Sequence, residues 1–208
     1  MKIKGFLSLC SFFFLSLTVL SGSNRIAFSG GLNHVFQYGS ESEYVPGEND
    51  FPVTPAHNNL TMAISYTRIF SHRYGFQLDL RRHSGTGLNL KDPSDDDEIQ
   101  IDGAGHLTVT LNFVYFLSKS SIKPYLIAGA GMDFLTGTKE QTVTSKFGYT
   151  VTISPPEKNA DLCFNLGTGM DFSLGKRIGL NLELRYLIIA GEDRINNVNF
   201  GAGIFLNF

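Results

Sequence analysis

The chain has 208 residues, of which 12% are aromatic and only 17% are charged, and its formal net charge is −2. A soluble domain usually carries about 25% charged residues, so this composition argues against an ordinary soluble enzyme. No basic excess is present, which argues against a nucleic-acid-binding surface. The length alone predicts a single domain.

The N-terminal segment has the pattern of a cleavable signal peptide. Two early lysines precede an apolar run at 6–20, and small residues follow at 21–23. The run is too short to span a bilayer comfortably, although an uncleaved anchor is the alternative. We therefore expect a signal peptide at 1–23 and a mature domain at 24–208. Cys163 is then the only thiol, so we expect no intramolecular disulfide.

Eight segments of the mature chain alternate apolar and polar residues with the period of a β-strand. They lie at 28–38, 60–70, 74–81, 106–117, 125–134, 161–172, 178–188 and 197–208. One face of each segment is apolar, and the other is rich in Gly, Asn, Ser, Thr and charged residues. A polar interior and an apolar exterior are typical of a barrel in a membrane, whereas a lipocalin-like soluble barrel has the reverse.

The connections between these segments alternate in length. Long connections lie at 39–58, 83–105 and 135–160, a short one lies at 190–196, and tight turns lie at 71–73, 118–123 and 175–177. Outer-membrane barrels place tight turns in the periplasm and long loops outside. We therefore predict an all-β fold, an eight-stranded antiparallel transmembrane up-and-down β-barrel, preceded by the cleavable signal peptide.

Two segments carry a resemblance to a known family: the KPYLIAGAG motif at 123–131 and the closing NFGAGIFLNF at 199–208. On these residues, the mature chain resembles the OmpA/OmpX-type eight-stranded outer membrane protein β-barrel family, in its barrel-only form. The resemblance implies a bacterial outer-membrane location, with outer-membrane lipids, lipopolysaccharide, periplasmic chaperones and the barrel-assembly machinery as partners. It also implies an assembly signal in the last strand, made of Phe200, Ile204, Leu206 and Phe208.

Seven charged side chains fall on the inward-facing parity of the predicted strands. Isolated buried charges are costly, so we expect these side chains to pair or to be hydrated. The interior of an eight-stranded barrel is only just filled by side chains, which favours a salt-bridge network that plugs the lumen over a charge gate in a narrow pore. The seven residues are Asp79, Arg81, Asp133, Asp161, Asp171, Glu183 and Arg185.

Other motifs indicate less. The paired glycines at 129/131, 167/169 and 201/203 do not continue into a nucleotide-binding GxGxxG, and we interpret them as sites of large lumen side chains or of strand coiling. The acidic run at 92–98 lacks calcium-loop spacing and is expected to be solvated surface, with a weak divalent-cation site as the alternative. His34 and Arg68 fall on the outward parity, and Arg68 is close enough to a turn to snorkel.

The best catalytic constellation is His83 and His106, near the outer ends of adjacent strands, from which they could approach Ser84 and the acidic run at 92–98. We expect no enzyme, cofactor, metal site or nucleic-acid partner, and we expect a monomer. The predicted function is a structural anchor that displays extracellular loops for envelope integrity, adhesion or host interaction, with an unidentified extracellular ligand. The alternatives are a small pore for ions or small solutes and, behind it, a lipid A-modifying enzyme.

Overall fold

The fold is described from a computed structural model. It covers residues 22–38, 53–55, 58–85, 88–91, 98–101, 105–136, 141–144, 150–153, 160–190 and 194–208. Residues 1–21 of the expected signal peptide at 1–23, and residues 92–97 of the acidic run at 92–98, lie outside these described residues. No helix in the described ranges is long and apolar enough to cross a membrane.

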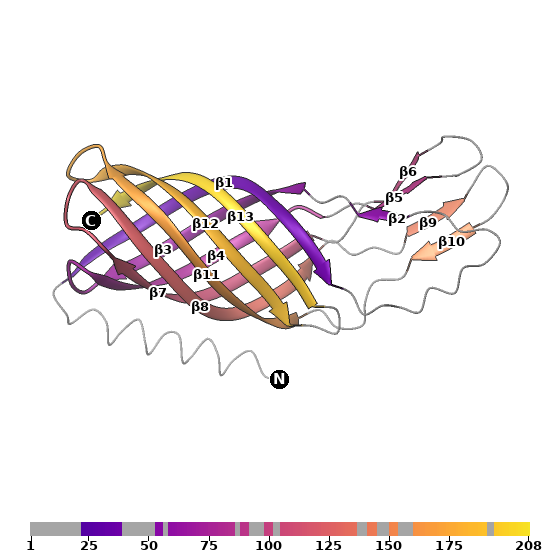
Figure 1. Ribbon diagram of the computed structural model, residues 1–208, viewed down its shortest axis with the longest axis horizontal. Coiled ribbons are helices and arrows are strands. Elements are labelled where there is room, and N and C mark those ends of the chain that lie inside the picture. Colours follow the sequence, from indigo (N-terminus) through magenta and orange to yellow (C-terminus); the bar gives the residue numbers. More distant parts are fainter. Residues whose placement is uncertain are drawn as a thin grey trace.

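Eight antiparallel strands form a closed barrel, as the alternation predicts (Figure 1). Neighbours around the barrel follow the order β1-β13-β12-β11-β8-β7-β4-β3. The strands are β1 (Ser23–Tyr38), β3 (Asn58–Ile69), β4 (Tyr74–His83), β7 (Gly105–Phe116), β8 (Ile122–Thr136), β11 (Ala160–Ser173), β12 (Ile178–Ala190) and β13 (Arg194–Asn207).

The first and last barrel strands pair along their whole length and close the ring. Arg25 lies opposite Asn207, and Tyr38 lies opposite Arg194. At the end of this seam the backbone N–H groups of Asn24 and Phe208 each donate to the other residue's carbonyl at 2.9 Å. The three tight turns, at 70–73, 117–121 and 174–177, lie at this same end of the barrel. The short strands β2, β5, β6, β9 and β10 lie beyond the opposite end (Figure 1).

The long connections contain strands, which corrects their interpretation as loops alone. β2 (Val53–Pro55), β5 (Leu88–Lys91) and β6 (Glu98–Ile101) form a three-stranded sheet, so the first connection pairs with the second. β9 (Gln141–Thr144) and β10 (Thr150–Ile153) form a separate hairpin. These segments alternate β-branched or apolar residues with polar ones over only three or four positions, a signal too short to stand out beside the barrel strands.

The two faces of the barrel wall have opposite character, as the predicted parity requires. Large apolar side chains on the outer face are between 36% and 70% exposed, among them Phe28, Leu32, Leu60, Met62, Leu111, Leu126, Phe164, Leu182, Leu184, Phe200 and Ile204. Polar side chains fill the inside and are buried, among them Asn33, Ser65, Thr67, Asp79, Arg81, Asn112, Asn165, Glu183, Arg185 and Asn199. The exposed apolar surface requires an apolar surrounding.

Inward-facing glycines either allow neighbouring strands to approach closely or make room for a large side chain in the lumen, and both cases occur in this barrel. A Cβ on Gly131 would overlap the Val109 carbonyl oxygen on the neighbouring strand, so the strands approach each other closely here. A Cβ on Gly169 would instead overlap the ring of Tyr125, its cross-strand partner. The first glycine permits coiling of the wall, and the second makes room for a lumen side chain.

Candidate functional site

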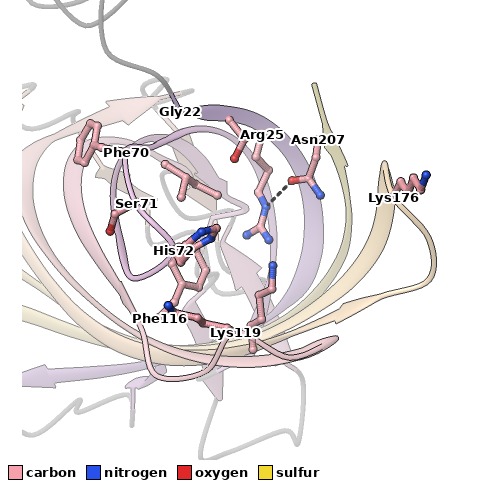
Figure 2. Close-up of a pocket in the computed structure, with 12 residues that line it drawn as sticks. Gly22, Arg25, Phe70, Ser71, His72, Phe116, Lys119, Lys176 and Asn207 are labelled. Atoms are coloured by element: carbon pink, nitrogen blue, oxygen red, sulfur yellow. Dashed lines mark hydrogen bonds between the residues drawn. The ribbon is translucent and has the colours of Figure 1, made fainter.

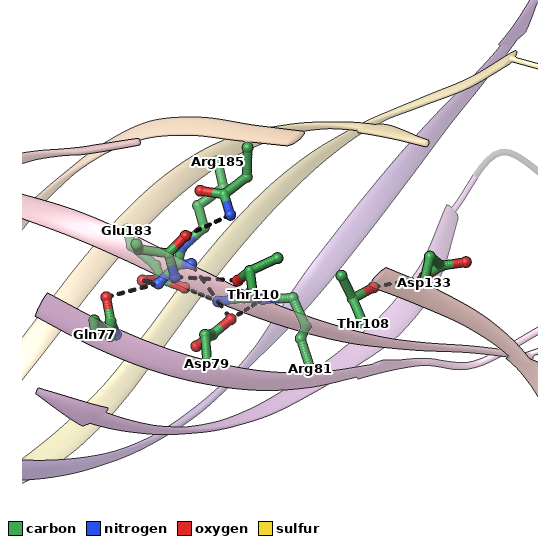
Figure 3. Close-up of polar contacts among 10 residues, drawn as sticks. Gln77, Asp79, Arg81, Thr108, Thr110, Asp133, Glu183 and Arg185 are labelled. Carbon is green, nitrogen blue, oxygen red and sulfur yellow. Dashed lines mark hydrogen bonds and ion pairs between the residues drawn. The ribbon is translucent and has the colours of Figure 1, made fainter. Parts of the chain in front are cut away.

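Four charged side chains meet in the middle of the lumen, and we call them the central cluster: Asp79, Arg81, Glu183 and Arg185 (Figure 3). They come from β4 and β12, and all four are buried. Arg81 pairs with Glu183 and donates to Asp79 at 3.2 Å. Arg185 donates to Asp79 at 3.3 Å and to Glu183 at 2.9 Å. Each arginine therefore contacts both carboxylates, which makes the cluster electrically neutral within itself.

The central cluster leaves almost no open space beside it. The cavity that it shares with Thr108, Thr110, Asn165, Leu187 and Asn199 has a volume of only about 10 Å³. That is about the space of one water molecule. The lumen is therefore closed at the level of these side chains.

Arg25 and Asp171 form a second buried ion pair, nearer the turns. The Asp171 side chain is fully buried, and the Arg25 guanidinium stacks 3.9 Å from the centre of the Phe205 ring. Cation–π contacts of this kind add to the stability of a desolvated arginine. Arg25 was absent from the predicted lumen charges because the first predicted segment began at Phe28. Extending the same parity back through Ala27 would have found it.

An apolar layer packs next to this pair. Val114 and Phe116 of β7 contact Tyr125 and Ile127 of β8, and all four are buried inside the barrel. The rings of Phe116 and Tyr125 meet edge to face at 5.9 Å. This layer seals the lumen by packing rather than by charge.

Toward the loop end of the lumen, Asp133 is held by two neighbours. His106 Nδ1 lies 2.6 Å from Asp133 Oδ2, and Thr108 donates to Asp133 Oδ1 at 2.7 Å. Asp161 lies opposite Asp133 in the ladder but forms no ion pair with any described residue. The seven predicted lumen charges are thus not one network. They divide into the central cluster, the Arg25–Asp171 pair, the His106–Asp133 pair and a separate Asp161.

The candidate catalytic constellation is only partly assembled. His83 lies directly opposite His106 in the β4–β7 ladder, with 1% of its surface exposed. The Ser84 hydroxyl is engaged with the backbone of Leu60, accepting from its N–H at 2.9 Å and donating to its carbonyl at 3.2 Å. In the described ranges, no group of three or more His, Cys, Asp or Glu side chains is arranged to hold a metal ion.

A row of asparagines crosses three neighbouring strands beside the central cluster. Asn59, Asn33 and Asn199 lie opposite one another in the β3–β1–β13 ladders, and all three are buried. Arg185 is next in the same row. Amides can donate and accept in any direction, so this row surrounds the cluster with polar groups without adding charge.

The turn end of the lumen opens into a pocket of about 680 Å³, which we call the turn-side mouth (Figure 2). Arg25 and Asn207 lie at its centre, joined by a hydrogen bond, while Lys176 lies at its outer edge. Its lining comes from strands and turns all around the barrel: Gly22, Ser23, Arg25, Ile69, Phe70, Ser71, His72, Phe116, Lys119, Lys123, Lys176 and Asn207.

Arg68 faces outward near this end, as its parity predicts, and is held at the rim by a hydrogen bond. It donates to the Asn24 side-chain oxygen at 2.6 Å, and the Tyr66 hydroxyl donates to the same oxygen at 2.8 Å. His34 also has the outward parity and is partly buried.

The sequence matches no family profile and no curated protein. Solved structures do match. Neisserial surface protein A aligns over 90% of this chain and 100% of its own, with a TM-score of 0.57 at 15% identity. The outer membrane protein OprG from Pseudomonas aeruginosa aligns over 91% of this chain and 98% of its own, with a TM-score of 0.52 at 12% identity. The chain has the fold of the eight-stranded outer-membrane barrels. At these identities the likeness establishes the fold and leaves the activity open.

Proposed function

We propose that this chain is a non-enzymatic integral protein of the bacterial outer membrane, a closed barrel that anchors its long connections on the cell surface. The observation that carries the proposal is a barrel with an apolar outer face and a lumen closed by the central cluster. Such a barrel satisfies every strand backbone in lipid, while its packed interior offers no passage.

The orientation follows from the connections. The tight turns lie at the same end of the barrel as its first and last residues, where Asn24 pairs with Phe208. The small sheets formed by β2, β5 and β6 and by β9 and β10 lie at the other end (Figure 1). In outer-membrane barrels the end with tight turns faces the periplasm. The displayed segments are then 39–57, 84–104 and 137–159, and they are the place for an extracellular ligand or for contact with lipopolysaccharide.

The location is tested by cell fractionation together with heat-modifiable gel mobility. The mature chain is expected in the outer-membrane fraction, with a folded form that migrates differently from the boiled one. A soluble periplasmic protein would overturn the proposal. Removal of Phe208 tests the predicted assembly signal, and we expect reduced surface abundance.

Closure of the lumen separates the anchor from the small pore. Purified protein in planar bilayers is expected to show no stable openings. Asp79→Ala combined with Arg81→Ala removes half of the central cluster and serves as the positive control. Stable openings of the unchanged protein would favour the pore.

The proposal that the protein is not an enzyme is supported by the Ser84 hydroxyl, which is hydrogen-bonded to the backbone of Leu60. Alteration of lipid A by the purified barrel, abolished by His106→Ala, would contradict that proposal.

A further inference from the structure

Three lysines bring positive charge to the turn-side mouth, whose described lining contains no acidic side chain. Lys119, Lys123 and Lys176 line it, and none of them forms an ion pair with a described residue. Lys123 lies opposite Asp171 in the ladder and attracts its carboxylate from a distance, but the ion pair and hydrogen bond of that carboxylate are with Arg25. Among the described residues that line the pocket there is no acid. Like charges gathered around one concavity repel one another unless an external anion joins them.

The same pocket is also partly apolar. Ile69, Phe70 and Phe116 contribute to its wall beside the lysines. The volume of about 680 Å³ lies within the usual range for sites that bind small organic ligands. An inorganic phosphate would leave most of this space empty and would not use the apolar wall. A ligand with several anionic groups on an organic chain would use both.

The floor of the pocket is built and fixed. Arg25 is buried at 8% exposure, stacks on Phe205, and is held by Asp171 and Asn207. Its charge is therefore already matched inside the wall. Lys119 and Lys176, by contrast, reach the pocket from two different turns, and Lys123 reaches it from the start of β8. None of the three has an ion-pair partner among the described residues, so they remain available to a ligand.

We propose that the turn-side mouth binds an acidic peptide segment, whose carboxylates contact Lys119 and Lys123 and whose carbon chain lies on Ile69, Phe70 and Phe116. A membrane surface is the less suitable occupant because the lining residues surround the barrel opening, whereas lipid headgroups lie outside the wall. Its placement in the periplasm rests on the orientation given under the proposed function.

Two other cations at the same rim provide a matched control. Arg73 and Arg177 are exposed in the turns and do not line the pocket. Arg73 lies within 3.5 Å of the Tyr115 hydroxyl, whose strand parity is outward. Replacing either pair of cations by glutamine removes the same amount of charge from the same end of the molecule.

The test uses the purified full chain in zwitterionic detergent and a fluorescently labelled hexaglutamate peptide, followed by anisotropy. The variants are K119Q/K123Q and R73Q/R177Q, each checked for heat-modifiable mobility. We expect the first pair to weaken binding by about tenfold or more, the factor that corresponds to a lost hydrogen bond to a charged group. The second pair should leave binding nearly unchanged.

Three outcomes would overturn the inference: no binding by the unchanged protein, equal losses in both double variants, or full competition by inorganic phosphate at the peptide's own concentration. Tighter binding to phosphatidylglycerol vesicles that depends on Arg73 and Arg177 would assign the rim to the membrane instead. The binding assay uses detergent-solubilised protein, so a negative binding result does not contradict the proposed membrane location. Conversely, if fractionation shows a soluble protein, the measured peptide binding is not contradicted.

Discussion

Two regions of the lumen gather charged side chains, and they differ in how those charges are compensated. In the central cluster, two arginines and two carboxylates contact one another and are buried. At the turn-side mouth, three lysines surround a pocket whose described lining has no acid. The same barrel therefore holds charges that are paired in the middle of the lumen and charges that lack an ion-pair partner among the described residues at its turn end. Matched charge closes the passage, and unmatched charge leaves a surface that an external anion can complete.

Glu183→Gln has the largest expected effect and tests whether the paired charges of the central cluster stabilise the fold more than the lysines of the mouth do. It leaves Arg81 and Arg185 buried with one carboxylate fewer, and breaking a buried pair costs about 3–5 kcal/mol. Urea-dependent unfolding from lipid vesicles measures the loss. Lys176→Gln removes a charge from the mouth and should change the unfolding free energy by no more than about 0.5 kcal/mol. Equal effects would show that the two regions do not differ.

Arg25 lies at the boundary between the two regions and has the next largest expected effect. Arg25→Gln leaves the buried Asp171 carboxylate without its ion pair, at an expected cost of about 2–3 kcal/mol in unfolding free energy. Lys123→Gln, opposite the same carboxylate, is the matched control and should cost far less. If the two substitutions lower the unfolding free energy equally in the same urea titration, the Arg25–Asp171 pair does not act as a buried ion pair like those of the central cluster.

The two regions should also differ in how tightly the backbone is packed, closely in the wall of the lumen and loosely at the turn-side mouth. Gly131 faces the lumen beside Thr110, and a Cβ there would overlap the Val109 backbone, so Gly131→Val should destabilise the barrel by about 1–3 kcal/mol. Gly175, in the turn beside Lys176, has nothing within 4 Å of an added Cβ. Gly175→Val is therefore expected to leave heat-modifiable mobility and unfolding unchanged. A silent Gly131→Val would mean that the wall is looser than the structure indicates.

The smallest expected effect on the unfolding free energy is at the outer rim of the barrel, where Asn24 accepts hydrogen bonds from Tyr66 and Arg68. Asn24→Ala removes the side-chain acceptor that Tyr66 and Arg68 share, at an expected cost of about 1 kcal/mol. The loss should be limited because both donors can reach interfacial water. A loss as large as that of Glu183→Gln would place this outer contact among the main determinants of stability.

The strand alternation was sufficient to predict the barrel and the inward side of each strand. Asp79, Arg81, Glu183 and Arg185 all face the lumen because side-chain direction has a strict period of two. The pairing among them could not be predicted, since it depends on how far each strand is shifted against the next. A row of paired residues that begins at Asn33 and passes around the barrel returns to β1 at Ser23, and only the structure supplies that shift.

The turn-side mouth was missed for a different reason. Lys119 and Lys176 lie in turns of five and four residues, where no periodic pattern marks a direction, and Lys123 lies at the start of β8, before the predicted segment at 125–134 begins. The pairing of β2 with β5 was missed because it joins two connections that each look like loops. The assembly signal at Phe200, Ile204, Leu206 and Phe208 stays a prediction.

The seam between β1 and β13 has a consequence for how the molecule must form. Seven of the eight pairings join strands that are consecutive around the up-and-down path, whereas the eighth joins residues as far apart as Arg25 and Asn207. Until that last pairing is made, two long strands have unpaired backbone edges, which are templates for aggregation. Such distant contacts form slowly. The folding chain therefore stays exposed to aggregation until β1 and β13 pair, and closure of the ring removes both edges together.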